Sequence, residues 1–130
     1  MIVKPDAVAR HAIGEILRRV ESEGFAVRGL RMLRLSQEQA RDFYGVHRER
    51  PFYAALVEFM TSGPVVPMAL ERDDAVAHLR RFIGVTDSTQ AAPGTIRRDL
   101  GTDVQRNAVH ASDSPANATR EIGFFFGSEF

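Results

Sequence analysis

The sequence predicts an α+β fold in which a four-stranded antiparallel sheet is covered by helices. Two observations lead to this prediction. Short apolar segments with strand character alternate with longer segments whose apolar residues recur at helical spacing. These elements follow one another in the order strand, helix, strand, helices, strand, helix, strand, helix. That order fits the ferredoxin-like split βαβ arrangement with added helices, and we expect the helices to cover one face of the sheet.

Length and composition indicate one domain spanning residues 1–130. This length lies within the roughly 100 to 200 residues typical of a domain and allows a sizeable core. The 17 basic and 17 acidic residues cancel, so no overall charge favours nucleic acid, membranes or acidic partners. The absence of cysteine excludes disulfides, thiolate metal sites and cysteine catalysis. No apolar run approaches the ~20 residues of a membrane helix and no signal peptide is visible, so we expect a soluble cytoplasmic protein.

Four segments are predicted to form the strands. The first is a short apolar run at residues 1–3, which Pro5 stops. Apolar residues alternate unevenly over residues 25–35, which favours a strand with arginines on its exposed face. Residues 65–70 are apolar almost throughout and indicate a buried strand, and Ala108–Val109 have the character of a buried strand end.

Helical spacing of apolar residues predicts the helices. Ser36 and Gln39 form a capping box that opens one of them, and Gly24 stands where a helix-terminating glycine belongs. The residues from Thr86 to about Asp99 show little periodicity, and a loop of this length is usually functional or disordered. The predicted helices span residues 13–23, 36–47, 52–60, 73–83 and 116–126.

One histidine lies on a short connection between a predicted strand and a predicted helix. His110 follows the strand end at Ala108–Val109, and Ser114 then Pro115 are typical of a helix N-cap and first helical position. A strand and a helix hold such a connection firmly, so its imidazole can be aimed as a nucleophile or general base needs. The alternative is a surface histidine beside a helix cap.

The eight residues from Asn107 to Ser114, Asn-Ala-Val-His-Ala-Ser-Asp-Ser, closely resemble the active-site signature of the nucleoside diphosphate kinases. This signature is highly specific, and the other matches extend the resemblance over essentially the whole chain. The matching strings are Lys4-Pro5-Asp6, Arg50-Pro51-Phe52, Ser62-Gly63-Pro64-Val65, Pro93-Gly94-Thr95-Ile96-Arg97 and Arg120-Glu121-Ile122.

The resemblance implies a ping-pong phosphotransferase. His110 takes the γ-phosphate of a nucleoside triphosphate through Nδ1, and the phosphohistidine then passes it to a nucleoside diphosphate. The family accepts many bases and maintains cellular NTP and dNTP pools. Mg²⁺ is expected to arrive on the nucleotide phosphates, because no protein metal cluster is visible in the sequence. Family members form homo-oligomers, tetramers or hexamers built from a common dimer, and usually begin several residues earlier, so residues 1–3 are expected to be the tail of a strand.

The resemblance also assigns four catalytic side chains. His110 is the nucleophile, Glu121 orients it, Ser112 supports that carboxylate, and Tyr44 lies close to the histidine. Without the resemblance, Glu121 would be interpreted as surface decoration of a helix, and Tyr44 as a core or rim tyrosine.

Four further residues are implied to hold the phosphates: Arg50, Arg80, Arg97 and the hydroxyl of Thr86. Phosphoryl transfer spreads negative charge over the equatorial oxygens, and arginine offers bidentate planar donors to them. Because no GxxxxGK[ST] loop is present, the arginines must replace the cradle of the P-loop enzymes. Arg80 alone could equally be a cation that complements the end of its helix.

The nucleoside is implied to bind through four more side chains. Lys4 and Asn107 reach the ribose hydroxyls. Phe52 lies beneath the base as a stacking platform, which tolerates any base because every base has a π-face, and Val104 closes over the opposite side. Taken alone, Lys4 could be a solvated surface lysine, and Phe52 a core aromatic.

Two alternatives to an active kinase remain open on the sequence. A binding or regulatory protein could have kept the fold without turnover, and a phosphohistidine relay could use His110 to pass phosphate to another protein. The first is disfavoured by the intact set His110, Arg80, Arg97, Asn107 and Glu121. The second is disfavoured by the implied ribose and base contacts, since a relay needs no nucleoside pocket. The chain departs from the family at Asp87-Ser88, where relatives often have Asn-Pro, and at Arg98, where many have glycine.

Overall fold

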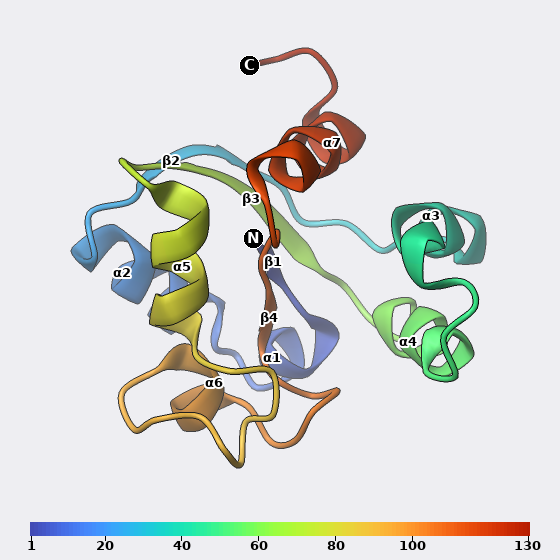
Figure 1. The fold of residues 1–130 in the computed structure, drawn as a ribbon, viewed down its shortest axis with the longest axis horizontal. Coiled ribbons are helices and arrows are strands. Elements are labelled where there is room, and N and C mark those ends of the chain that lie inside the picture. The colour runs from blue at the N-terminus through green and yellow to red at the C-terminus, as the bar shows by residue number, and fades with distance from the viewer.

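The computed structural model describes residues 1–130 and contains one four-stranded antiparallel sheet (Figure 1). Its strands lie in the order β2-β3-β1-β4, so β1 and β3 are central and β2 and β4 form the edges. This arrangement confirms the predicted ferredoxin-like α+β fold. The strands are β1 (Ile2–Val3), β2 (Ala26–Leu30), β3 (Val66–Glu71) and β4 (Val109–His110).

The helices lie near their predicted positions, and their caps follow from local sequence. The Ser36 hydroxyl accepts the Gln39 backbone N–H while the Gln39 side chain accepts the Ser36 N–H, which confirms the capping box. Ser114 likewise caps the last helix, with Pro115 at its first position. The helices are α1 (Pro5–Ala9), α2 (Ile13–Ser22), α3 (Gln37–Phe43), the 3₁₀ helix η1 (Gly45–His47), α4 (Tyr53–Met60), α5 (Ala75–Ile83), α6 (Ile96–Leu100) and α7 (Pro115–Phe126).

Two short helices were not predicted. Pro5 does end the apolar run of β1, but it also occupies the first position of α1, where its missing N–H costs nothing. Helix α6 lies inside the stretch predicted as a loop, where Thr95 caps it by accepting the Arg98 N–H. Each has five residues, too few to show a helical repeat.

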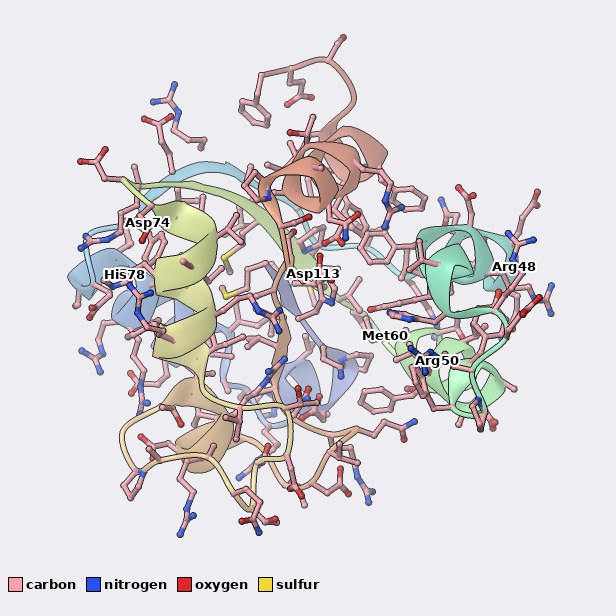
Figure 2. All side chains as sticks on the ribbon, in the orientation of Figure 1. Arg48, Arg50, Met60, Asp74, His78 and Asp113 are labelled. Carbon is pink, nitrogen blue, oxygen red and sulfur yellow. The ribbon has the colours of Figure 1, made fainter.

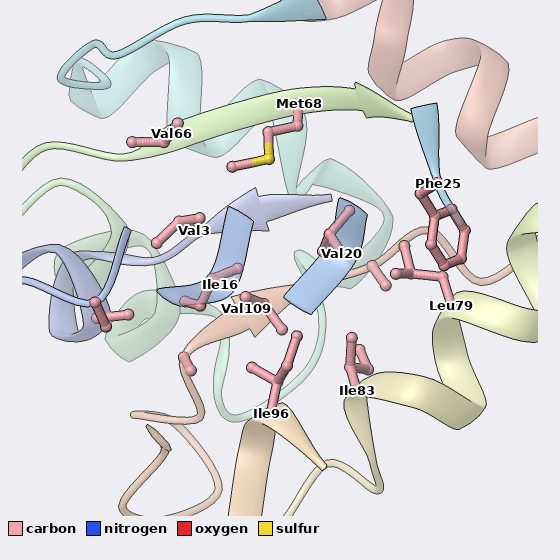
Figure 3. Close-up of a cluster of buried hydrophobic side chains, with 14 residues drawn as sticks. Val3, Ile16, Val20, Phe25, Val66, Met68, Leu79, Ile83, Ile96 and Val109 are labelled. Atoms are coloured by element: carbon pink, nitrogen blue, oxygen red, sulfur yellow. The ribbon is translucent and has the colours of Figure 1, made fainter. Parts of the chain in front are cut away.

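Helices cover both faces of the sheet, so the expectation that one face is covered was wrong. Adjacent strand residues point to opposite faces. On one face, Val3 and Val66 belong to a core cluster completed by α2, α5 and α6, which Figure 3 shows in close-up. On the other face, Ile2 and Val65 belong to a second cluster with α3, α4 and α7. The sheet is thus the middle layer between two hydrophobic cores.

The end of β4 lies next to the second core cluster, the one with α3, α4 and α7. Most of the predicted site residues are carried by chain segments around this point. Val109 pairs with Val3 and His110 with Ile2, so β4 is fixed against the central strand. Since Val109 joins the first cluster, the His110 side chain emerges on the face of α3 and α7. None of the helices is both long and apolar enough to cross a membrane.

Ser88 offers a test of the loop between α5 and α6. It is 2% exposed, and its hydroxyl has no hydrogen-bond partner. Because a desolvated, unpaired hydroxyl is costly, we expect Ser88→Ala to leave the free energy of unfolding unchanged or to raise it by up to about 1 kcal/mol. Urea unfolding measures this, and a loss above about 1 kcal/mol would show that the hydroxyl has a partner in solution.

Candidate active site

A cavity of about 560 Å³ opens beside the end of β4. It is lined by segments that lie far apart in the sequence, from Lys4 just after β1 through α3 and α5 to α7. Such a cavity is large enough for a nucleotide-sized ligand. Ten of the predicted site residues line it, namely Lys4, Tyr44, Phe52, Arg80, Thr86, Arg97, Val104, Asn107, His110 and Glu121.

At the back of the cavity, a carboxylate holds the His110 imidazole. Nε2 of His110 lies 2.7 Å from Oε1 of Glu121, and the Ser112 hydroxyl donates to the same oxygen at 2.8 Å. Glu121 lies on α7, and the helix fixes its position. The N-cap of α7 is Ser114, which follows His110 by four residues. Three predicted residues therefore form one hydrogen-bonded chain, although Ser112 itself does not line the cavity.

The protonation state of this pair follows from burial and hydrogen bonding. Burial lowers the pKa of His110 below its usual value, with Glu121 partly opposing the shift. Burial alone would raise the pKa of Glu121, but the hydrogen bonds from His110 and Ser112 outweigh it and lower that pKa. An ionised Glu121 can only accept, so Nε2 of a neutral His110 carries the proton. Nδ1 makes no hydrogen bond within the protein and retains its lone pair.

Aromatic rings fix the plane of the imidazole. The rings of Phe43 and Tyr44 meet that of His110 edge to face, with centroid distances of 5.5 and 6.0 Å. Tyr44 is 5% exposed, and burial raises the pKa of its hydroxyl, so Tyr44 stays protonated and can donate a hydrogen bond. Both rings also line the cavity.

Three arginines line the cavity, namely Arg80 from α5, Arg97 from α6 and Arg120 from α7. Arg80 lies in the last turn of α5 and donates to the carbonyl of Ala111, next to His110. Arg97 lies on α6, is 7% exposed and donates to the carbonyls of Gly84 and Val109. Burial, and to a lesser extent Arg80, lowers the pKa of Arg97 to about 10, so the Arg97 guanidinium is charged at neutral pH.

Lys4 and Asn107, which both line the cavity, are joined by a hydrogen bond. Nζ of Lys4 donates to Oδ1 of Asn107 at 2.9 Å, and the amide of Asn107 donates to the carbonyls of Thr86 and Val104. Asn107 thereby connects β1 to the loop after α5. Burial lowers the pKa of Lys4 to about 8.

The outer part of the cavity is apolar and accessible. Phe52, just before α4, and Val104 both line it, and their exposed fractions of 49% and 59% are high for large apolar residues. The ring of His47 lies 5.4 Å from that of Phe52 and also lines the cavity. Partly exposed apolar side chains at a cavity mouth are available to contact a flat ring.

Arg50 is the predicted phosphate residue that does not line the cavity. It lies in the turn before α4, where its N–H donates to the carbonyl of His47 (Figure 2). Conversely, several residues in the lining were not predicted, including Asp113 and Arg120, which stand inside or beside strings that resemble the family. Phe43 and His47 carry no such signal, because an aromatic on a helix is usually interpreted as core.

Comparisons with known proteins identify the family of the chain. The family model described as nucleoside diphosphate kinase matches residues 1–130. The chain belongs to the nucleoside diphosphate kinase family. Nucleoside diphosphate kinase of Desulforapulum autotrophicum is 51% identical over 125 residues, which are 96% of this chain and 91% of that protein. The chain is therefore an enzyme that transfers phosphate between nucleotides.

Solved structures of nucleoside diphosphate kinases have the same fold. The enzyme of Aquifex aeolicus is 53% identical with a TM-score of 0.96, covering 98% of this chain and 92% of that one. The enzyme of Halobacterium salinarum, solved in complex with CDP, is 42% identical with a TM-score of 0.95, covering 98% of this chain and 86% of that one.

Proposed function

We propose that the chain transfers the γ-phosphate of a nucleoside triphosphate to a nucleoside diphosphate by a ping-pong mechanism through a phosphohistidine on His110, and so maintains cellular NTP and dNTP pools. One observation supports the proposal more strongly than any other. Glu121 occupies Nε2 of His110, which leaves the lone pair of Nδ1 free within a cavity that three arginines line. A nucleophile oriented by a third group is the general pattern of covalent catalysis.

In the first half-reaction, Nδ1 attacks the γ-phosphorus, the bond between that phosphorus and the β–γ bridging oxygen breaks, and the diphosphate leaves. The proton on Nε2 stays within its hydrogen bond to Glu121, whose negative charge stabilises the imidazolium character that develops. In the second half-reaction, a terminal oxygen of another nucleoside diphosphate attacks the same phosphorus and the N–P bond breaks. One cavity serves both halves because the diphosphate that leaves and the diphosphate that enters differ only in base and sugar.

Arg80, Arg97 and the Thr86 hydroxyl supply the positive charge and donors that the transferring phosphoryl group requires. Arg97 is held by two carbonyls before any ligand arrives, so little reorganisation accompanies the reaction. Arg50 is proposed to join them only through movement of its turn.

Mg²⁺ is proposed to arrive on the nucleotide, where it neutralises the phosphate oxygens. The structure contains no group of three or more His, Cys, Asp or Glu that could hold a metal ion. Of the carboxylates in the lining, Glu121 is engaged by His110 and Ser112, and Asp113 is the other.

Lys4 and Asn107 are proposed to bind the ribose, with Phe52 and Val104 on the two sides of the base. Phe52→Ala is expected to raise the KM for ATP and GTP alike, by about 5- to 150-fold, because stacking on one aromatic is worth ~1–3 kcal/mol per base. Initial rates with both nucleotides measure this. A loss confined to one base would contradict stacking as the basis of broad specificity.

Activity should decline on the acid side as His110 takes up a proton. Protonation removes the Nδ1 lone pair, and burial lowers the pKa of His110. The neutral form thus persists to lower pH than for a free histidine, and half of the maximal phosphorylation rate should be reached below pH ~6.5. Single-turnover rates from pH 5 to 8 give this midpoint. A midpoint above 7 would contradict a buried neutral nucleophile.

The partners proposed beyond nucleotides are further copies of the chain, in a tetramer or hexamer built from dimers. Edge strand β2 supports self-association, since Leu30 and the following Met32 are 44% and 57% exposed. An apolar sheet edge is prone to pair with another chain. Light scattering gives the subunit number, and a monomer at micromolar concentration would refute this part. No specific nucleic-acid or membrane partner is proposed.

Steady-state kinetics test the reaction type. Varying ATP at several fixed GDP concentrations is expected to give parallel double-reciprocal plots, because the first product leaves before the second substrate binds. Intersecting plots would indicate direct transfer in a ternary complex and would overturn the phosphohistidine route.

A further inference from the structure

A strained three-residue turn lies directly before His110. The Val109 N–H donates to the carbonyl of Asn107 at 2.9 Å, and the residue between them, Ala108, has φ 75°. A bond between residues i and i+2 around a positive φ is the rare and strained form of the γ-turn. Alanine is not a residue that adopts this backbone region readily.

This turn sets the relation between two cavity residues. Asn107 precedes the strained position, and His110 follows it by two residues. The reversal of the chain at Ala108 lets Asn107 reach the loop after α5 while β4 runs along β1 with His110 at its end. If Ala108 relaxed to a negative φ, both side chains would change direction together.

The segment that follows β1 forms hydrogen bonds with both backbone polar groups of Ala108. The Lys4 N–H donates to the carbonyl of Ala108 at 2.9 Å, and the Ala108 N–H donates to Oδ2 of Asp6 at 3.0 Å. Lys4 also holds Asn107 through its side chain. Asp6 lies in the first turn of α1, so its carboxylate is fixed by a helix that begins where β1 ends.

The Asp6 carboxylate is costly to keep in this place. Its other oxygen, Oδ1, is buried and has no partner. Burial raises the pKa of Asp6, with the Ala108 N–H opposing the shift. No arginine or lysine forms an ion pair with it, so its one long-range interaction is the hydrogen bond to the backbone of the strained turn. Unpaired buried groups and strained backbone persist where the arrangement serves a site.

We propose that Asp6 is a positioning residue: by holding the Ala108 N–H it keeps the strained turn in place, and so aims His110 and Asn107 into the same cavity. This inference rests on the proposed function, because its readout is the rate of phosphate transfer. Asp6 does not line the cavity and acts through the backbone of the turn.

Four variants test the inference. Asp6→Ala removes the acceptor, while Asp6→Asn retains an oxygen that can accept from Ala108. Ala108→Gly removes the strain, because glycine adopts a positive φ freely. The double variant Asp6→Ala/Ala108→Gly tests whether the turn keeps its conformation without the hydrogen bond to Asp6 when the backbone strain has been removed. Ser36→Ala, which loses the exposed cap of α3, is the control for a general loss of stability.

The measured quantity is the single-turnover rate at which ATP phosphorylates the protein, normalised to the fraction of protein that can be phosphorylated. The nucleotide dissociation constant is measured in parallel. A displacement of about 1 Å costs roughly 100-fold in rate, so we expect Asp6→Ala to lose between about 10- and 100-fold. Asp6→Asn should stay within about threefold of the original protein, and the double variant should recover most of the loss. Ser36→Ala should transfer phosphate at the original rate per site, since stability alone does not change this rate.

Three results would overturn the inference. They are an Asp6→Ala rate within twofold of the original, an Asp6→Asn rate as low as that of Asp6→Ala, and a double variant no faster than Asp6→Ala. If Asp6→Ala does not fold, the double variant decides, since a folded but slow double variant contradicts the inference and a fast one supports it. Failure of the proposed function would instead appear as absent phosphorylation in the original protein.

Discussion

His110→Ala is expected to abolish phosphate exchange, by more than about 10⁴-fold, because the variant has no atom that can carry the phosphate between nucleotides. Nucleotide binding should persist within about threefold, since Nδ1 bonds to phosphorus only during reaction and the arginines, Phe52 and Asn107 are unaltered. Coupled exchange assays with ATP and GDP measure the first quantity, and calorimetric titration with ADP measures the second.

His78→Ala is the matched control. His78 also pairs with a glutamate, with Nε2 2.9 Å from Oε1 of Glu23, but it lies on α5 and does not line the cavity (Figure 2). This variant should exchange phosphate at the original rate. Exchange retained by His110→Ala would remove the central proposal, and equal losses in both variants would point to a general effect of replacing a paired histidine.

Arg97→Lys is expected to lower kcat by roughly 100-fold, because removing one preorganised donor to a developing charge costs about 10²–10³ in rate. The variant keeps the positive charge but loses the planar guanidinium. That group donates to two carbonyls and at the same time lines the cavity, which an ammonium group cannot reproduce. KM should change much less, since the charge still attracts the phosphates. Full steady-state kinetics separate the two parameters.

Arg98→Lys on the same helix is the control for this substitution. Arg98 is exposed, donates to the carbonyls of Thr89 and Ala91, and does not line the cavity. Its variant should keep kcat within about twofold, as expected for a surface change away from a site. A comparable loss in both variants would mean that the stability of α6, rather than the guanidinium of Arg97, sets the rate.

The fold could be predicted from the order and periodicity of its elements, and the limits of that prediction have physical causes. The long helices α2, α5 and α7 show several turns of apolar spacing, whereas α1 and α6 are too short to show one. The covering of both faces was missed, although the almost continuous apolar run at residues 65–70 is typical of a strand buried on both sides. The two-residue strands β1 and β4 are too short to reveal which face is buried.

The candidate site was predicted mostly through its resemblance to a family, since composition and periodicity do not bring distant residues together. The hydrogen bonds of Glu121 to His110 and Ser112 join residues 11 and 9 positions apart in the sequence, so they are nearly local. The bond between Asp6 and Ala108 spans 102 positions, and the positive φ of Ala108 leaves no mark in a sequence where the residue is not glycine. Pairings of this kind become visible only once β1 and β4 lie side by side.

The most direct test of the central proposal is to incubate the protein with ATP and Mg²⁺, measure its mass, and then add GDP. We expect one acid-labile phosphate per chain, mapped to His110 and discharged to form GTP. Absence of phosphorylation despite bound ATP, or a phosphate on another residue, would contradict it. A phosphate on His110 that only a second protein can discharge would indicate a relay instead of a nucleotide kinase.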